Sequence, residues 1–245
     1  MKQSIFEIIS NVEIAPSVMK MILKGDCSNI TAPGQFVNIK LDGLFLRRPI
    51  SVCDASESEL TIIYKIVGKG TELMSKMQKG ECLDVLSGLG NGYDTTLSGN
   101  SPVLIGGGVG VPPLYMLAKK LKSQGKKVNV ILGFNKKSEI FYENEFKNIA
   151  DSVTVTTVDG SYGVKGFVTD ALKDIDYTYF YTCGPEPMLK AIFSSSRAEG
   201  QLSFEESMGC GFGACMGCSC KTIYGNKRIC KEGPVLKKEE ILWEK

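Results

Sequence analysis

Four cysteines near the C-terminal end of the sequence have a spacing that is typical of an iron–sulfur site. Cys210, Cys215 and Cys218 form a C-x4-C-x2-C pattern, and Cys230 follows twelve residues after Cys218. This is the plant-type arrangement of ligands for a [2Fe-2S] cluster. Glycines are interspersed with the cysteines, and a loop without side chains can turn its backbone amides toward the sulfurs. We therefore predict that these four cysteines bind one [2Fe-2S] cluster.

A structural zinc site is the alternative for the same residues, because zinc also binds four cysteines. Zinc ribbons usually contain two C-x2-C pairs, and only Cys215 with Cys218 forms such a pair here. Cys220 is a fifth candidate ligand that competes with Cys218. The sequence contains no histidine, which excludes histidine-ligated zinc and haem, Rieske clusters and histidine-based catalytic triads. The odd total of nine cysteines favours a metal or redox site over a disulfide framework.

Two glycine turns are candidates for binding a pyrophosphate. Residues 106–113 read Gly-Gly-Gly-Val-Gly-Val-Pro-Pro, between a short apolar strand and a helical pattern. The segment departs from G-x-G-x-x-G, and a tight strand-to-helix turn is the alternative. A second turn, at 182–188, follows a later strand of the same predicted sheet. Doubly wound sheets bind nucleotides at such turns, so we predict a site that includes Gly107, Gly108, Gly110, Cys183 and Gly184.

A third motif lies in the first hundred residues. Arg47-Arg48-Pro49-Ile50-Ser51 combines guanidinium groups, which bind phosphate, with a hydroxyl that can hydrogen-bond the edge of a ring system. Gly68-Lys69-Gly70-Thr71 precedes a short predicted helix, where backbone amides and an N-cap oxygen would add to the site. A solvated pair of surface arginines is the alternative, and only the order of the three motifs favours a cofactor site.

The elements expected around these motifs divide the chain into three parts. Residues 1–98 contain short β-rich runs separated by turns, which predicts an antiparallel β-barrel. In residues 99–203 strands alternate with helical patterns, which predicts a doubly wound parallel α/β nucleotide-binding domain. Residues 204–245 fit neither pattern and are predicted to form a small module around the cysteines. The predicted fold class is therefore a multidomain α+β protein.

In this order the motifs resemble the ferredoxin–NADP reductase superfamily, in which a flavin-binding barrel precedes a nucleotide-binding domain. Within it, the chain is similar to the family of electron transfer subunits of NAD-dependent, type B dihydroorotate dehydrogenases. The resemblance covers nearly the whole chain, from Pro33-Gly34-Gln35-Phe36-Val37 onward. The position of the four cysteines after Cys183-Gly184-Pro185 is its most specific part.

The resemblance implies that the barrel binds FAD, the α/β domain binds NAD, and the C-terminal module holds the [2Fe-2S] cluster. Arg48 would bind the FAD phosphates, and Ser51 would lie near the reactive flavin nitrogen. The aromatic residue usual in this stretch of the superfamily is absent, which leaves Tyr64 or another aromatic residue to stack on the flavin. The residues implied to line the FAD are Arg48, Pro49, Ile50, Ser51, Lys65, Ile66, Val67, Gly70 and Thr71.

The resemblance also implies a partner, an FMN-containing catalytic subunit that oxidises dihydroorotate in pyrimidine (UMP) biosynthesis, in a heterotetramer with two copies of each subunit. No catalytic acid or base is expected in this chain. Met208, Phe212 and Met216 are expected to face that partner. The alternative is that Phe212 and Met216 only shield the cluster from water. The other functional hypotheses are a related reductase subunit of a sulfur, hydrogenase or ferredoxin–NADP system, and a zinc-stabilised binding module without enzymatic activity.

The sequence leaves the choice between NADH and NADPH open. Phe134-Asn135-Lys136-Lys137 occupies the place of the usual acidic residue, and lysines there can bind a 2′-phosphate. The net charge of +2 gives no reason to expect a nucleic-acid or membrane partner, and the longest apolar runs are far too short to cross a bilayer. The N-terminal residues lack the features of a signal peptide, so we expect a cytoplasmic protein.

Overall fold

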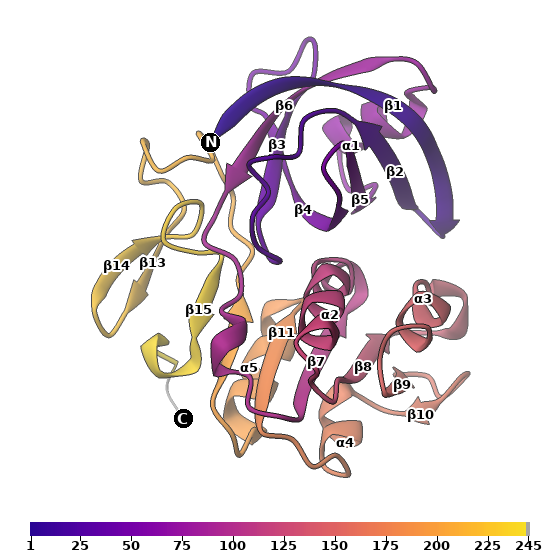
Figure 1. Cartoon of the computed structure of the whole chain (residues 1–245), viewed down its shortest axis with the longest axis vertical. Coiled ribbons are helices and arrows are strands. Elements are labelled where there is room, and N and C mark those ends of the chain that lie inside the picture. The colour runs from indigo at the N-terminus through magenta and orange to yellow at the C-terminus, as the bar shows by residue number, and fades with distance from the viewer. Residues whose placement is uncertain (244–245) are drawn as a thin grey trace.

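A computed structural model describes residues 1–243, which form a barrel, an open sheet and a C-terminal module (Figure 1). The barrel strands are β1 (Lys2–Ala15), β2 (Val18–Lys24), β3 (Phe36–Lys40), β4 (Arg48–Ala55), β5 (Glu59–Lys65) and β6 (Cys82–Leu89). They close in the order β1-β2-β5-β4-β3-β6, and all pairs are antiparallel. Alternate residues of β6 are buried, so one face of the strand fills the interior. The predicted antiparallel barrel is confirmed.

One helix, α1 (Lys69–Lys76), connects β5 to β6. Asn11 of β1 caps its C-terminal end, because the Asn11 side-chain amide donates to the carbonyls of Met74 (2.8 Å) and Met77 (3.0 Å). Met74 is also completely buried in the barrel core. These contacts fix the helix on the barrel, with its N-terminal turn against Arg48 at the beginning of β4.

The second domain is built on a seven-stranded sheet. Its strands are β7 (Pro102–Gly107), β8 (Asn129–Phe134), β9 (Ser152–Thr157), β10 (Val164–Lys165), β11 (Tyr179–Cys183), β12 (Gly200–Ser203) and β15 (Val235–Lys237). Their order is β10-β9-β8-β7-β11-β12-β15, and only the pairing of β12 with β15 is antiparallel. Every residue of β7 and β11 is buried, as in central strands that are covered on both faces.

Helices cover both faces of this sheet, namely α2 (Pro113–Ser123), α3 (Glu143–Lys147), α4 (Val168–Leu172) and α5 (Glu186–Ser195). Leu104 of β7 packs into one core with α2 and α3, whereas its neighbours Val103 and Ile105 pack into a second core with α4 and α5. The predicted doubly wound domain is therefore confirmed. None of the helices within residues 1–243 has the length and apolar character needed to span a membrane.

The C-terminal segment begins as a separate module and then rejoins the sheet. β13 (Ser219–Thr222) and β14 (Gly225–Arg228) form a hairpin, after which β15 pairs with β12. Residues 235–237 thus belong to the sheet, although the sequence places them in the module 204–245. β15 covers the edge of β12, which would otherwise present a row of unpaired backbone groups. Figure 1 shows this segment in yellow beside the barrel and the sheet.

Candidate functional site

Arg48 lies where the first turn of α1 meets the beginning of β4. A Cβ atom at Gly70 would come within 2.2 Å of the Arg48 Nε, so only glycine leaves room for this side chain. The guanidinium donates to the carbonyls of Leu46 (2.5 Å) and Arg47 (3.4 Å) and forms no ion pair within residues 1–243. The amides of the first helical turn have no partner within the helix. An unpaired positive charge beside such amides fits the phosphates of FAD.

Arg47 contributes to the structure of the barrel instead. Its guanidinium donates to the carbonyls of Asn38 (3.2 Å) and Asp84 (3.1 Å) and pairs with the Asp84 carboxylate (3.0 Å). These contacts tie β3 to β6 and leave the Arg47 side chain 21 % exposed. Only one of the two adjacent arginines is therefore available to a cofactor.

Thr71 shapes the turn before α1. Its hydroxyl accepts hydrogen bonds from the amides of Val67 (3.0 Å) and Gly68 (3.3 Å) and donates to the Gly68 carbonyl (3.1 Å). The expected N-cap role of Thr71 is wrong, because the helix already begins at Lys69 and Gly68 is its N-cap. The Thr71 hydroxyl therefore orders the loop, and its contribution to a phosphate site is limited to the backbone amide.

The other residues expected around the flavin lie at one end of the barrel. β4 runs antiparallel to β5, so the beginning of β4, with Pro49, Ile50 and Ser51, meets the segment that follows β5. In that segment the Ile66 amide donates to the Ser17 carbonyl (2.8 Å), and Val67 is 79 % exposed. Pro49, Ile50 and Ser51 are half-buried, which leaves part of each side chain open to a ligand.

Tyr64 does not reach this surface. Its side chain is 2 % exposed and lies in the barrel core, and its hydroxyl donates to Asn11 Oδ1 (3.0 Å). Tyr64 is therefore wrong as a candidate to stack on the flavin, because alternation along β5 points it inward.

The two glycine turns lie side by side at the carboxyl edge of the sheet, since β7 and β11 are neighbouring parallel strands. A Cβ atom at Gly110 would come within 2.3 Å of the Cys183 carbonyl oxygen, and one at Gly107 within 2.5 Å of the Met188 sulfur. These glycines let the turns pack together. Gly108, with a φ of +52°, has no atom within 4 Å of the position of a Cβ and faces open space.

A cleft of about 530 Å³ opens along this edge. The glycine turns, the ends of β8 and β9, and Lys65 of the barrel line it. Gly184 belongs to the lining, whereas Cys183 is buried and does not. Thr156 also lines the cleft, and its hydroxyl is buried with no hydrogen-bond partner within the described residues. The size of the cleft fits a ligand such as a dinucleotide.

Several cleft residues lie outside the motifs found in the sequence, and Glu139, Phe167 and Glu205 are among them. Phe167 is 64 % exposed, and burial raises the pKa of the Glu205 carboxyl group. No local pattern marks these residues, because only the order of the strands brings them to one cleft.

The four predicted cluster ligands lie in two pairs. The Cys215 amide donates to the Cys210 Sγ (3.5 Å), and the Cys230 amide donates to the Cys218 Sγ (3.4 Å). Each iron of a [2Fe-2S] cluster takes two protein ligands, so paired thiols suit two irons. Within residues 1–243, no group of three or more cysteines and carboxylates is gathered as around a single metal ion.

Backbone amides surround the Cys210 sulfur. Burial raises the pKa of the Cys210 thiol, but the amides of Phe212, Cys215 and Ala214 outweigh burial and lower the pKa to about 6. The Ala214 amide lies 3.2 Å from the sulfur. Because the thiolate is the form that binds metal, this loop is prepared for a metal centre.

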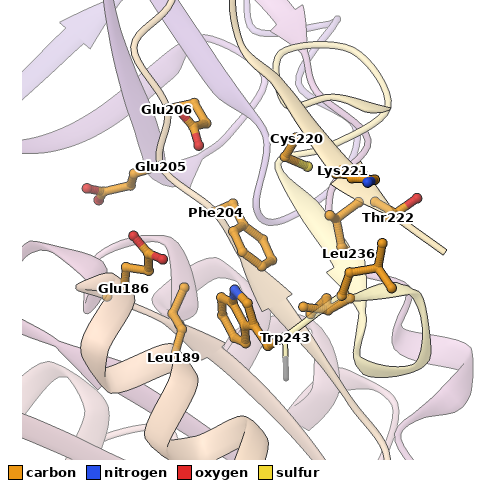
Figure 2. A pocket seen from close by; sticks show the side chains of 13 residues that line it. Glu186, Leu189, Phe204, Glu205, Glu206, Cys220, Lys221, Thr222, Leu236 and Trp243 are labelled. Atoms are coloured by element: carbon orange, nitrogen blue, oxygen red, sulfur yellow. The ribbon is translucent and has the colours of Figure 1, made fainter. Parts of the chain in front are cut away.

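Cys220 lines a separate pocket of about 380 Å³. Figure 2 shows its side chain around this pocket together with Phe204, Leu236 and Trp243. The rings of Phe204 and Trp243 pack with their centres 5.4 Å apart. This placement favours Cys218 over Cys220 as a cluster ligand.

Two protein-family models match the segments that carry these sites. Residues 205–242 match the iron–sulfur cluster binding domain of dihydroorotate dehydrogenase B, and residues 104–193 match the oxidoreductase NAD-binding domain. Among solved structures, NADH-dependent reduced ferredoxin-NADP oxidoreductase contains a chain that is 33 % identical with a TM-score of 0.88, over 97 % of this chain and 90 % of that one. A flavohemoglobin from Malassezia yamatoensis shares the fold at 20 % identity and a TM-score of 0.66, over 80 % of this chain and 56 % of that one.

Curated relatives match over nearly the full length. The dihydroorotate dehydrogenase B (NAD(+)) electron transfer subunit of Bacillus pumilus is 44 % identical in an alignment of 255 positions, which covers 98 % of this chain and 98 % of the relative. That of Fusobacterium nucleatum is 46 % identical over 241 residues, 92 % of this chain and 93 % of the relative. Together with the paired cysteines and the cleft, these similarities show that the chain belongs to the family of dihydroorotate dehydrogenase B electron transfer subunits.

Proposed function

We propose that this chain carries electrons between NAD and an FMN-containing catalytic subunit that oxidises dihydroorotate in pyrimidine biosynthesis. Its relatives are named as electron transfer subunits of that enzyme. The chain would contribute the [2Fe-2S] cluster on Cys210, Cys215, Cys218 and Cys230, FAD at the end of the barrel, and the NAD cleft. The observation that carries the proposal is the direct contact between the cluster loop and the flavin end of the barrel.

Asn38 of β3 makes this contact. It lies opposite Pro49 of β4, and its side-chain amide donates to the Cys210 carbonyl (3.3 Å). The side chain is 1 % exposed, and its Oδ1 has no hydrogen-bond partner within the described residues. One buried residue thus joins the cluster loop to the strand that begins with Arg48. This contact supports a short path for electrons between cluster and flavin.

The proposed division of tasks follows from the positions of the side chains. Bound FAD supplies the conversion between hydride exchange with the nicotinamide and single-electron exchange with a cluster. Arg48 and the first turn of α1 hold its phosphates. Lys65 ends β5 and also lines the NAD cleft, so the flavin end of the barrel and the cleft adjoin. The chain's residues bind and orient the redox groups, and no side chain is assigned as an acid or base.

The cluster loop offers a surface for the catalytic subunit. Phe212 is 45 % exposed and Met216 is 53 % exposed, and aromatic residues and Met are enriched in interface cores. Met208 is half-buried and packs against the core of the sheet, so it offers less surface to a partner than Phe212 and Met216. The proposed assembly is a heterotetramer with two copies of each subunit.

Co-expression with the catalytic subunit tests the proposal. The purified complex should show flavin and [2Fe-2S] absorption, reduce NAD⁺ when dihydroorotate is added, and have the mass of two copies of each subunit in analytical ultracentrifugation. A colourless protein that contains zinc would contradict the electron-transfer function.

The similarity to ferredoxin-NADP oxidoreductase supports a second candidate, a reductase subunit that serves ferredoxin. Its 33 % identity is lower than the 44 % and 46 % of the dihydroorotate dehydrogenase relatives. Rapid NADH-dependent reduction of ferredoxin, without coupled activity toward dihydroorotate, would favour this candidate.

A further inference from the structure

Beyond the glycine turns, the cleft extends toward β8 and β9, on the side of β7 that faces away from β11. Its lining here includes Thr156, Val158 and Phe167. The Thr156 hydroxyl is buried without a hydrogen-bond partner in the described chain, and Phe167 is an exposed aromatic ring. An exposed aromatic ring at this end of the cleft can stack on a base, which fits the adenosine half of a dinucleotide.

Glu139 lines the same part of the cleft, at the end of a 3-10 turn, η3 (Lys137–Glu139). Its Oε2 accepts hydrogen bonds from the side-chain amide (3.0 Å) and the backbone amide (3.4 Å) of Asn135. Asn135 directly follows β8, so these bonds hold the carboxylate close to the end of the second strand. Within residues 1–243 Glu139 forms no ion pair.

The two lysines that precede Glu139 are directed elsewhere. The Lys137 Nζ lies 5.7 Å from the centre of the Tyr162 ring. Lys136 lies near Asp159, where hydrogen bonds from Ser161 and a smaller contribution from Lys136 lower the pKa of the Asp159 carboxyl group. Neither lysine lines the cleft. At this end of the cleft a phosphate on the ribose would therefore meet the Glu139 carboxylate and neither Lys136 nor Lys137.

We propose that Glu139 selects NAD over NADP, and that Asn135 is its positioning residue. A carboxylate at the end of the second strand accepts a hydrogen bond from the ribose 2′-hydroxyl of NAD. The same carboxylate repels the 2′-phosphate of NADP, because it forms no ion pair within residues 1–243 that would compensate its charge. No acidic residue stands at the end of β8, and Glu139, five residues after Phe134, supplies the carboxylate instead. This inference rests on the proposed assignment of the cleft to the dinucleotide.

Calorimetric binding of two nucleotide fragments to the full chain, with its FAD and cluster, tests the inference. ADP-ribose carries the 2′-hydroxyl and 2′-phospho-ADP-ribose carries the phosphate, and neither exchanges electrons. In Glu139→Gln we expect the Kd for ADP-ribose to rise about tenfold and the Kd for 2′-phospho-ADP-ribose to fall by a similar factor, since one charged hydrogen bond is changed. Asn135→Ala should have the same effects with smaller factors, a rise in the Kd for ADP-ribose and a fall in the Kd for 2′-phospho-ADP-ribose.

Glu239→Gln is the matched control, because Glu239 lies in another 3-10 turn, η4 (Lys238–Glu240), and does not line the cleft. This variant should leave both constants unchanged. If Glu139→Gln binds both fragments as the unmodified chain does, the role of Glu139 is overturned while the cleft assignment stands. If neither fragment binds the unmodified chain, the cleft assignment fails, and the inference fails with it.

Discussion

The Arg47 guanidinium makes three contacts that join β3 to β6, whereas the Arg48 guanidinium contacts only two neighbouring carbonyls. Truncation of Arg47 would leave the Asp84 carboxylate, which is 18 % exposed, without its ion-pair partner and with only the hydrogen bond from the Gln3 side-chain amide (2.8 Å). We expect this to cost roughly 1–3 kcal/mol of the free energy of unfolding, as for other hydrogen bonds to charged groups. The charge of Arg48 is uncompensated in the structure, so its truncation should affect a ligand more than the fold.

Arg48→Ala should weaken FAD retention by about one to two orders of magnitude, because each charge-assisted hydrogen bond to a phosphate contributes roughly 1.5–3 kcal/mol. The measurement is the flavin content after extensive dialysis. Arg47→Ala is the matched variant, and it should lower the unfolding midpoint while it keeps its flavin at moderate temperature. The reverse pattern would move the phosphate site from Arg48 to Arg47.

Serine replacement of Cys210, Cys215, Cys218 or Cys230, one at a time, should abolish the electron paramagnetic resonance signal of the reduced cluster. Thiolates are the required ligands, and a hydroxyl does not substitute for them at soft iron sites. Cys220→Ser should keep the signal, because Cys220 lines the separate pocket with Phe204 and Trp243. A normal signal in Cys230→Ser, with loss in Cys220→Ser, would show that Cys220 is the fourth ligand.

The residues predicted from the sequence are those whose role depends on local spacing. The cysteine ligands and the glycines of the turns belong to this group, since neighbouring residues define their geometry. The sequence left open whether Tyr64 stacks on the flavin, because its direction depends on the pleat of β5, which places it in the barrel core. Glu139 has no motif at all, and the Asn135 side chain that positions it gives no recognisable pattern.

At the level of elements, the glycine turns after β7 and β11 depend on each other. Gly110 lets one turn contact the carbonyl of Cys183 in the other turn. An added methyl group would push the turns apart, because a backbone carbonyl has no rotamer that would move it aside. The consequence should be local to the cleft, since the barrel and the cluster module do not contain these turns.

Gly110→Ala should therefore lower the affinity for NAD by roughly five- to 150-fold, given the roughly 1–3 kcal/mol cost of overpacking a packed site. FAD content and the cluster signal should be unchanged. Gly108→Ala is the comparison, since a Cβ there meets no atom within 4 Å and only the left-handed backbone is strained, by about 1–2 kcal/mol. Titration with ADP-ribose measures the Kd of both variants. A Gly110→Ala chain that binds ADP-ribose as tightly as the unmodified chain would contradict the packing role of Gly110.

The barrel and the doubly wound domain could be predicted because each has a periodic pattern, alternation in one and strand–helix succession in the other. β15 could not be predicted. It has three residues, Val235–Lys237, and its place beside β12 depends on the sheet edge that needs a partner. The 3-10 turn η3 is equally short, and the sequence does not indicate that it returns a carboxylate to the cleft.

In the whole molecule, some barrel residues pack into a core of the sheet. Cys53 and Ile63 of the barrel lie in the same cluster as Leu114 of α2, and the Tyr93 hydroxyl donates to the Thr182 carbonyl of β11 (3.1 Å). The Asn38 contact attaches the cluster loop to the same body. Packing, and not a linker, sets the separations of the three sites. In the proposed function the cluster is the redox site that faces another subunit, and its loop carries the exposed Phe212 and Met216.

Phe212→Asp tests whether this loop docks on the catalytic subunit. Burial of an unpaired carboxylate in an interface costs several kcal/mol, roughly 3–5 by analogy with broken buried pairs, which corresponds to a more than hundredfold loss of affinity. We expect the variant to keep its FAD and cluster spectra and its oxidation of NADH by artificial acceptors, because Phe212 belongs to none of the three packed cores. Dihydroorotate-dependent reduction of NAD⁺ with the partner should be lost.

Tyr224→Asp provides the matched control, since Tyr224 is an aromatic residue that is 70 % exposed on the turn between β13 and β14. The variant should keep the dihydroorotate-dependent reduction of NAD⁺ with the partner, because Tyr224 lies outside the cluster loop. If Phe212 instead shields the cluster from water, Phe212→Asp should bleach faster in air while it still co-purifies with the partner. A Phe212→Asp chain that retains full coupled activity would place the docking surface elsewhere, and loss in Tyr224→Asp alone would shift it to the hairpin.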